Sequence, residues 1–213
     1  MILTSEETAI LNGEQGKATQ KAMEILIALG TIYKAERMIP VSSVQVSGVS
    51  YANLGEAGLE YLLEMAANGG KARILTTLNP AGMDIENWEE LGISKDFAQK
   101  QQRVLEAFAE MNIITTCSCT PYLFGNTPHY GEHIAWAESS AVCYANSVIG
   151  ARTNREGGPS ALAASITGRT PNYGFHLVKN RKPDIFIQVN AQIINNRDFG
   201  ALGHAIAKKF EGS

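Results

Sequence analysis

The sequence lacks the features that direct a chain to a membrane or to nucleic acid. No apolar run approaches the roughly 18 residues that a membrane-spanning helix requires. The first twelve residues carry Glu6 and Glu7 and no basic segment, so they do not form a signal peptide. The net charge is -3 and like charges do not form long runs, which gives no indication of a nucleic-acid surface. We therefore expect a cytoplasmic protein with no membrane or nucleic-acid partner.

Cysteine is also scarce, with Cys117, Cys119 and Cys143 in 213 residues. An odd number in a cytoplasmic protein argues against a disulfide framework. Cys117 and Cys119 are too close in sequence to chelate a zinc ion by themselves. Isolated cysteines are often small buried hydrophobes, and Cys143, in a predicted helix with apolar neighbours, fits that interpretation. The chain has no Walker loop, no GxGxxG and no GxSxG motif, so nucleotide binding and serine-hydrolase chemistry are not indicated.

What the sequence does contain is a regular alternation of predicted helices and strands. Hydrophobic residues make up 45% of the chain and charged residues 18%, which is typical of a globular protein. Helices are predicted near the start, where Thr4 and Glu7 fit a capping box, and over 17–38, 56–67, 95–111, part of 133–149, 160–166 and 199–210. Strands are predicted over 41–46, 72–78, 113–117 and 184–189, and residues 167–183 are predicted to be a long loop. The expected fold class is α/β, a mostly parallel sheet with flanking helices.

Three of the predicted strands are followed by loops of small and polar residues, over 47–51, 79–84 and 117–122. In an open parallel sheet, ligands bind beyond the carboxyl ends of the strands. Each loop alone could be an ordinary turn, because Ser-Gly and Asn-Pro are common turn sequences. Three such loops at one edge have the composition of a site for a small polar ligand.

A fourth polar region follows the third loop. Glu138 lies among apolar residues of a predicted helix, so it is either a solvated charge or a partly buried site residue. The segment from Arg152 to Gly158 could bind a carboxylate or a phosphate through bidentate guanidinium contacts, or could be a solvated turn. We count Arg152 among the candidate substrate contacts.

Longer stretches of the sequence resemble the aconitase X family over nearly the whole chain. The stretches are IPVSSVQVSGVSYANLGEAGLEYL, TTLNPAGMD, CTPY, GEHIAWAESSAV and ANSVIGARTNREGGPSALAASITGRTPNYGFHL. The resemblance implies an aconitase-superfamily-like fold and an iron–sulfur cluster. It implies one of two dehydratase activities. One acts on (R)-5-phosphomevalonate in isoprenoid biosynthesis, through the mevalonate pathway, with separate large and small subunits. The other acts on cis-3-hydroxy-L-proline in a single chain.

The resemblance also implies roles for individual residues. Cys119, in the CTPY motif, would be a ligand of the cluster, whose iron would act as a Lewis acid on the leaving hydroxide. Ser50, by analogy with the serine base of aconitase, or Glu138 would act on the proton, although a serine requires strong local activation. Gln45 stands where many members of the family carry histidine. The substrate would be held by Gly48, Val49, Ser50, Asn79, Pro80, Glu138 and Ser139.

The catalytic chain of the family is much longer, and its other cluster cysteines lie in its second half. We therefore expect residues 1–213 to form the N-terminal part of an aconitase X catalytic domain, without the second half. We expect no second lobe after the last predicted helix, which is followed closely by Gly212 and Ser213. Alone, the chain should hold an incomplete cluster and be inactive, and its partners should be a small-molecule substrate, the small subunit and the missing C-terminal half.

The expected activity is phosphomevalonate dehydration, because no small domain is fused to the chain. The first alternative is cis-3-hydroxy-L-proline dehydration. An alternative from another class is a non-catalytic half that binds the substrate or a partner chain without turnover. A further alternative is a cluster-free α/β enzyme with a phosphate site at the Arg152 loop.

Overall fold

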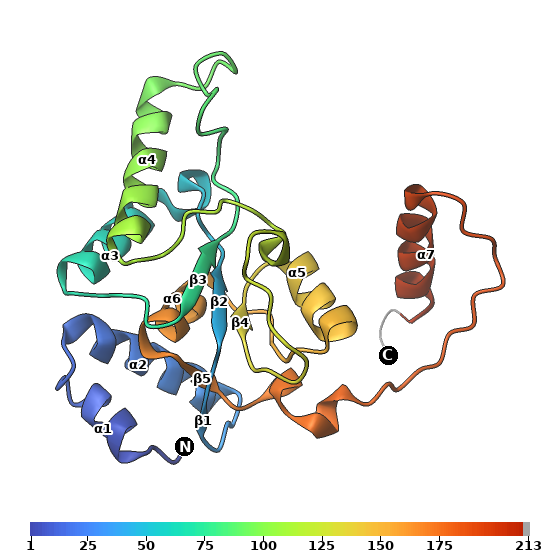
Figure 1. The fold of residues 1–213 in the computed structure, drawn as a ribbon, viewed down its shortest axis with the longest axis horizontal. Helices are drawn as coiled ribbons and strands as arrows, with labels where there is room; N and C mark the ends of the chain where they lie inside the picture. The colour runs from blue at the N-terminus through green and yellow to red at the C-terminus, as the bar shows by residue number, and fades with distance from the viewer. Residues whose placement is uncertain (211–213) are drawn as a thin grey trace. The chain divides into compact units, whose positions relative to one another are not determined.

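The computed structural model describes residues 1–210, so Gly212 and Ser213 lie outside the described residues. The chain divides into two compact units, Met1–Arg181 and Lys182–Ser213 (Figure 1). Among residues 1–210, none of the helices combines the length and the apolar character that a membrane span requires. The predicted site residues all belong to the first unit.

A parallel sheet of three strands, in the order β3-β2-β4, forms the centre of the first unit. These strands are β2 (Ser43–Val46), β3 (Leu75–Leu78) and β4 (Ala135–Trp136). The register pairs Gln45 with Thr77 on one side and with Trp136 on the other. A separate antiparallel pair joins β1 (Met38–Pro40) to β5 (Arg169–Pro171). The parallel sheet with its surrounding helices confirms the predicted α/β class.

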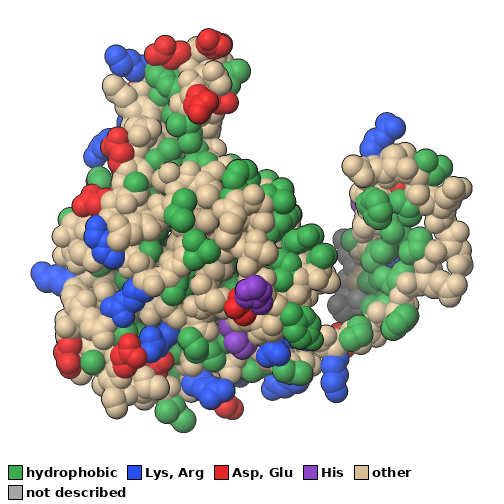
Figure 2. Space-filling view, in the orientation of Figure 1, with side chains coloured by type: hydrophobic (Ala, Val, Ile, Leu, Met, Phe, Trp, Pro, Cys, Tyr) green, Lys and Arg blue, Asp and Glu red, His purple; other side chains and the backbone are tan. Residues whose placement is uncertain are grey.

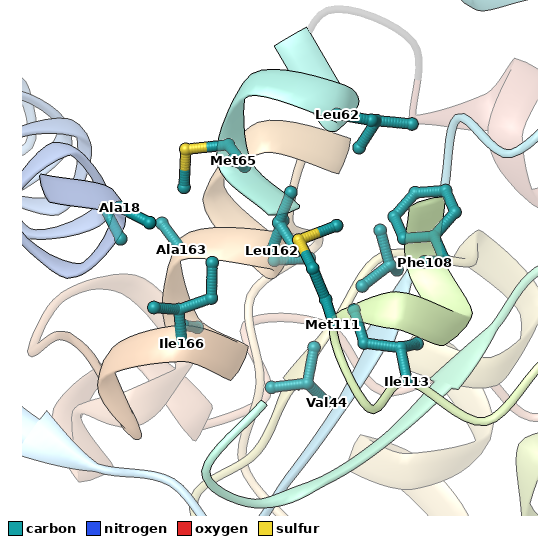
Figure 3. Close-up of a cluster of buried hydrophobic side chains, with 14 of the residues drawn as sticks. Ala18, Val44, Leu62, Met65, Phe108, Met111, Ile113, Leu162, Ala163 and Ile166 are labelled. Atoms are coloured by element: carbon teal, nitrogen blue, oxygen red, sulfur yellow. The ribbon is translucent and has the colours of Figure 1, made fainter. Parts of the chain in front are cut away.

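One face of the sheet carries the main hydrophobic core. Val44 and Val46 are buried there beneath four helices, which are α2 (Lys17–Ile32), α3 (Tyr51–Ala67), α4 (Lys95–Glu110) and α6 (Gly158–Thr167). Figure 3 shows how side chains from these helices meet side chains of the sheet. Residues 160–167 of α6 are all buried, because this helix packs against both α2 and β2. The apolar run over 160–166 is therefore explained by packing on every side.

The other face of the sheet is covered by shorter elements. Trp136 and Ile134 form a second core cluster with residues of α5 (Ser139–Tyr144) and of the π-helical turn Ala145–Ile149. Short 3-10 turns lie at Pro121–Leu123, Gly174–His176 and Val178–Arg181. The helix predicted within 133–149 is confirmed only from Ser139 onward, because residues 135–136 form β4. On the surface, acidic side chains gather over the loop before α4 (Figure 2), where the sequence has Asp84, Glu86, Glu89 and Glu90.

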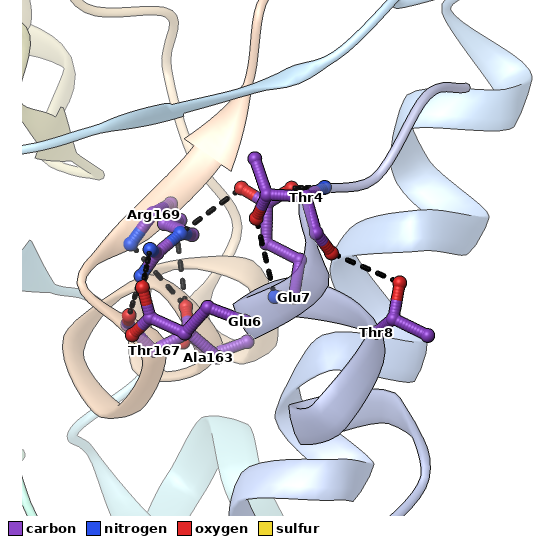
Figure 4. A network of polar contacts seen from close by, with 7 residues as sticks. All are labelled: Thr4, Glu6, Glu7, Thr8, Ala163, Thr167 and Arg169. Carbon is purple, nitrogen blue, oxygen red and sulfur yellow. Dashed lines mark hydrogen bonds and ion pairs between the residues drawn. The ribbon is translucent and has the colours of Figure 1, made fainter.

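The first helix, α1 (Ser5–Leu11), begins with the predicted capping box. The Glu7 backbone N–H donates to Thr4 Oγ1 at 3.2 Å, and the Thr4 N–H donates to Glu7 Oε2 at 2.7 Å. Arg169 Nε donates to Glu7 Oε1 at 3.0 Å and Arg169 Nη2 to Glu6 Oε2 at 2.7 Å (Figure 4). Arg169 Nη1 also donates to the carbonyl of Thr167 at 3.2 Å. These contacts connect α1 to the end of α6 and the start of β5.

The helix predicted over 17–38 ends at Ile32, six residues early. Lys34 adopts a left-handed φ of 55°, and its N–H donates to the carbonyl of Thr31. The Ala35 N–H donates to the carbonyl of Gly30 at 2.7 Å, which completes a Schellman motif. The chain then enters β1, whose partner β5 lies in the region predicted to be a loop.

The strand predicted over 113–117 is wrong, although the segment lies beside β3. Ile114 forms an isolated bridge with Thr77, but the next contact is made by a side chain. Thr116 Oγ1 accepts from the Leu78 N–H at 3.2 Å and donates to the Leu78 carbonyl at 3.0 Å. Cys117 then has a φ of 46°, outside the extended region. The side chain of Thr116 thus replaces the backbone ladder.

The strand predicted over 184–189 is also wrong. These residues belong to the second unit, are exposed, and form no strand within the described part of the chain. Extended backbone forms a strand only where a neighbouring strand takes up its hydrogen bonds. The helix predicted over 199–210 is confirmed as α7 (Asn196–Lys209), and a capping box between Asn195 and Asp198 extends its start.

Candidate active site

The loops that follow the parallel strands leave the sheet at one edge. The Asn79 N–H donates to the carbonyl of Val46 at 2.9 Å, where β2 and β3 end together. On the other side of β2, the Ala137 N–H donates to the carbonyl of Gln45 at 3.1 Å. The Ser118 N–H donates to the carbonyl of Leu78 at 3.0 Å, so the third loop begins at the same edge. The parallel register therefore brings the predicted site loops to the carboxyl edge of the sheet.

Asn79 and Glu138 are in direct contact at this edge. Asn79 Nδ2 donates to Glu138 Oε2 at 2.9 Å, and Glu138 Oε1 accepts from Ser139 Oγ at 3.2 Å and from the Ser140 N–H at 3.4 Å. Partial burial alone would raise the pKa of the Glu138 carboxyl. The hydrogen bonds from Asn79, Ser140 and Ser139 outweigh burial and hold this pKa below its usual value. Glu138 is therefore an ionised acceptor at neutral pH.

The amide oxygen of Asn79 takes no part in its contact with Glu138. Asn79 Oδ1 is buried and has no hydrogen-bond partner within the described residues. A buried acceptor without a donor is costly, so this oxygen is suited to accept a hydrogen bond from a ligand. Pro80, the next residue, is exposed at the same edge.

The Gly48–Val49–Ser50 segment makes the turn between β2 and α3. Gly48 has a φ of 75°, a conformation that glycine adopts without strain. Val49 is buried in the core and anchors the turn, whereas Ser50 is half-buried at the N-cap position of α3. Ser50 makes no side-chain cap, and α3 is interrupted at Gly55, so the first helical stretch after Ser50 is only 51–54. Such a short turn has little helix dipole with which to activate the hydroxyl.

The three cysteines have different environments. Cys119 is exposed in the third loop, next to Ser118, whose carbonyl accepts from Gln45 Nε2 at 3.0 Å. Cys117 is half-buried against the core, and burial raises the pKa of its thiol despite a hydrogen bond from the Ala81 backbone. Cys143 is exposed on α5, so its prediction as a buried core residue is wrong. It lines a separate cavity of about 300 Å³ together with Asn146, Phe175 and Arg181.

The described residues offer a metal ion few ligands that lie close together. Within residues 1–210, no group of three or more His, Cys, Asp or Glu side chains is close enough to hold one. Cys119 is the cysteine that the third loop exposes at the carboxyl edge, and a thiolate is a suitable ligand for an iron–sulfur cluster. The residues present therefore fit one ligand of such a cluster.

Arg152 lies away from the other predicted site residues. It forms a bridge with His133, before the start of β4, and its N–H donates to the carbonyl of Glu132 at 2.8 Å. His133 Nδ1 lies 3.0 Å from His176 Nδ1. Burial lowers the pKa of His176 to about 3, and the positive charge of Arg152 contributes to this shift, which places Arg152 near the histidine pair. Arg152 is therefore at the amino end of β4, and the register does not support its prediction as a substrate contact.

A different arginine lies at the carboxyl end of the same strand. Arg155 forms a bridge with Trp136 and is exposed, and the next N–H, that of Glu156, donates to the Trp136 carbonyl at 2.9 Å. A Cβ on Gly158 would approach the Ser47 carbonyl oxygen to 2.7 Å, so the chain after Arg155 packs closely on the loop after β2. The sequence placed both arginines in one basic loop, and only the strand register separates them.

Gln101, on α4, is a site-forming residue that sequence analysis did not select. It is fully buried, and its side-chain amide contacts both the loop after β2 and the loop after β3. A signal was present, because Gln101 lies on the same helix face as the apolar residues Val104, Leu105 and Phe108. A polar residue on a buried helix face requires partners.

Known proteins are similar to this chain over most of its length. The family model described as "Aconitase X first domain" matches residues 1–179. The chain is 54% identical over 206 residues to the phosphomevalonate dehydratase large subunit of Methanothermobacter thermautotrophicus, covering 97% of this chain and 51% of that protein. It is 33% identical over 187 residues to the cis-3-hydroxy-L-proline dehydratase of Hypocrea jecorina, covering 88% of this chain and 31% of that protein.

A solved structure gives the same result for the fold. The crystal structure of Thermococcus kodakaraensis aconitase X, in its holo-form, superposes with a TM-score of 0.90 at 52% identity. The match covers 99% of this chain and 52% of that chain. The chain thus spans about half the length of the first curated relatives it matches.

Proposed function

The chain belongs to the aconitase X family, and from this premise we propose that it forms the N-terminal part of the large subunit of a dehydratase acting on (R)-5-phosphomevalonate. The choice of substrate rests on sequence identity. The chain is 54% identical to a phosphomevalonate dehydratase large subunit but 33% identical to a cis-3-hydroxy-L-proline dehydratase. The reaction removes a hydroxyl from one carbon and a proton from its neighbour, and yields a carbon–carbon double bond and water.

In this proposal, Cys119 holds the iron–sulfur cluster together with ligands from outside the described residues. When bound, the cluster supplies a Lewis acid that assists the departure of hydroxide. Glu138, held ionised by Asn79, accepts the proton from the substrate. The helical stretch after Ser50 is too short to lower the pKa of its hydroxyl much, so we assign Ser50 to substrate binding rather than to proton transfer.

The remaining residues hold and orient the substrate. Asn79 Oδ1 accepts a hydrogen bond from a substrate hydroxyl. Ser139 Oγ, exposed and already donating its proton to Glu138, accepts another. The register supports Arg155 as the cation that binds the phosphate or carboxylate, in place of Arg152. The other residues proposed to line the substrate site are Gly48, Val49 and Pro80.

The proposal gives the chain two polypeptide partners in the cytoplasm, which are the second half of the large subunit and a small subunit. Relatives of about twice this length are named large subunits, which supports both partners. The second unit also supports them, because α7 has no buried residue and its apolar side chains lie on the surface (Figure 2). In this unit Phe186 is 97%, Ile194 78% and Phe199 61% exposed, as side chains that contact a partner would be.

The proposal is tested by anaerobic complementation. The purified 213-residue chain is combined with the second half of the Methanothermobacter thermautotrophicus large subunit and a small subunit, supplied with iron and sulfide, and assayed on both substrates. We expect the assembly, and not the chain alone, to be red-brown and to dehydrate phosphomevalonate. Preference for cis-3-hydroxy-L-proline would overturn the substrate, and turnover by the chain alone would contradict its incompleteness. A colourless assembly with no turnover would favour a non-catalytic half.

The same assembly tests the ligand assignment. Cys119→Ser should abolish the visible absorbance of the cluster, because it removes the thiolate at the carboxyl edge. Cys143→Ser is the matched control, because Cys143 is also exposed but lines the separate cavity with Asn146. Equal loss of absorbance in both variants would refute the assignment.

A further inference from the structure

Two of the site loops share one buried side chain that comes from neither loop. Gln101 Oε1 accepts from the Tyr51 N–H at 3.0 Å and from the Gly82 N–H at 3.0 Å. Gln101 Nε2 donates to the carbonyl of Val49 at 2.9 Å. The residue is 0% exposed. One amide therefore fixes the backbone on both sides of Ser50 and, at the same time, the end of the Asn79 loop.

The two loops are in close contact where Gln101 joins them. A Cβ on Gly82 would overlap Ser50 Oγ, so only a glycine leaves space for this hydroxyl in its observed position. The same Cβ would lie 3.0 Å from Gln101 Oε1 and 3.1 Å from the ring of Phe97. The position of Ser50 thus depends on how closely residue 82 approaches it.

Helix α4 holds Gln101 independently of the loops. Ser94 caps the helix by accepting from the Phe97 N–H at 3.3 Å, and Val104 and Phe108 fix the helix in the core. A further contact joins α4 to the loop after β2, because Phe97 packs edge-on against the ring of Tyr51, with centroids 5.9 Å apart. Because the helix is anchored elsewhere, Gln101 can act as a fixed reference for both loops.

From these contacts we infer that Gln101 is a positioning residue, which sets the distance between the Ser50 loop and the Asn79–Glu138 pair without touching the substrate. The inference rests on the proposed dehydration. A glutamine amide suits this role because it accepts two N–H groups and donates one in a single plane. Without it, the N–H groups of Tyr51 and Gly82 and the carbonyl of Val49 would lose their partner, and the loops would separate.

The first test measures how firmly Gln101 holds the two loops, and it needs no enzyme assay. In the 213-residue chain, Gln101→Met removes the three hydrogen bonds at nearly constant volume. We expect amide hydrogen exchange at Tyr51 and Gly82 to become at least about tenfold faster. Gln102→Met, at the exposed neighbour on the same helix, should leave both rates unchanged. Unchanged exchange in Gln101→Met would overturn the inference.

The second test measures turnover in the complemented assembly. Gln101→Met should lower kcat about 100-fold, as expected for misplacement of reacting groups by about 1 Å, with a much smaller change in KM. Gly82→Ala should have the same signature, because it displaces Ser50 from the other side. A KM effect alone, or no effect, would overturn the positioning role.

Gln101→Glu supplies a pH-dependent rescue. A protonated carboxyl reproduces the amide, since it can donate to the Val49 carbonyl and accept from both N–H groups. Its ionised form cannot donate to that carbonyl. The ratio of kcat in this variant to kcat in the wild type should therefore fall as pH rises, and a ratio independent of pH would overturn the inference. If the wild-type assembly turns over neither substrate, the proposed function fails, whereas the exchange rates at Tyr51 and Gly82 still decide whether Gln101 holds the two loops together.

Discussion

The contact between Asn79 and Glu138 makes the charge of the proposed base depend on one amide. In Asn79→Leu, the carboxyl loses the hydrogen bond that contributes most to lowering its pKa, whereas burial still raises it. The pKa of Glu138 should therefore increase. Because the proposed base acts when ionised, kcat/KM should begin to fall at a higher pH in the variant than in the wild type as the solution is acidified.

This shift is measured from pH–rate profiles of the complemented assembly and from carboxyl carbon NMR titration of Glu138 in the chain alone. Asn53→Leu is a control, because Asn53 is exposed at the start of α3 and its side chain has no hydrogen bond within the described residues. An acid limb at the same pH in Asn79→Leu and the wild type would show that Glu138 is not the titrating group.

Arg155 and Arg152 form a matched pair for testing how the anionic group is held. Arg155→Gln should raise KM for phosphomevalonate by about 10- to 100-fold, because it removes a charge-assisted contact at the carboxyl edge. Arg152→Gln should change KM less than about twofold, because Arg152 is beside His133 at the other end of β4. Steady-state kinetics of both variants decide the question, and the reverse order would restore Arg152 as the contact.

Sequence patterns selected those residues of the proposed site that directly follow strands. Asn79 and the turn at Gly48 were predicted because a parallel sheet places its ligands at one edge. Gln101 and Arg155 were not selected, since their roles depend on distances across the fold. Gln101 contacts backbone 19 and 52 residues away in the sequence, and no local pattern carries that information.

At the scale of elements, two ion pairs join α1 to β5, and the more exposed pair is a control for the buried one. The Glu7 side chain is 5% exposed and that of Glu6 54%, yet both contact Arg169. Glu7→Gln should lower the free energy of unfolding by about 2 kcal/mol, because it leaves the guanidinium partly unpaired in a buried setting. Glu6→Gln should lower it by less than about 1 kcal/mol, as for a surface pair. Urea unfolding of both variants measures the difference, and equal effects would contradict the burial argument.

Element boundaries were predicted where standard end signals occur. Gly69 follows the C-cap of α3 with a left-handed φ of 81°, and Ser94 caps α4; glycine and serine are the usual residues at these two positions. The end of α2 was missed because Lys34, rather than a glycine, adopts the left-handed conformation of its Schellman motif. The false strand over 113–117 has the composition of a strand, but the Thr116 hydroxyl competes for the hydrogen bonds of Leu78. In both places a local interaction gave a structure that differs from the one that the residue types usually favour.

At the scale of the whole chain, the division after Arg181 implies that the first unit folds without the second. Both core clusters are built from residues of the first unit. Arg181 itself belongs to this unit, since its Nη1 donates to Asn146 Oδ1 at 2.7 Å. Helix α7 has no buried residue, so the second unit contributes little burial of its own.

Deletion of residues 182–213 should therefore change Tm by less than about 2 °C, because surface changes of up to about 0.5 kcal/mol shift Tm by that much in a protein of this size. Deletion of residues 174–213 is the control, since it also removes the 3-10 turn that carries the buried His176 and the Arg181 contact with Asn146. That longer deletion should lower Tm by more than about 5 °C, because it opens a cavity and leaves His133 without its partner. Differential scanning calorimetry compares the two, and a large loss of Tm in the shorter deletion would show that the second unit stabilises the first.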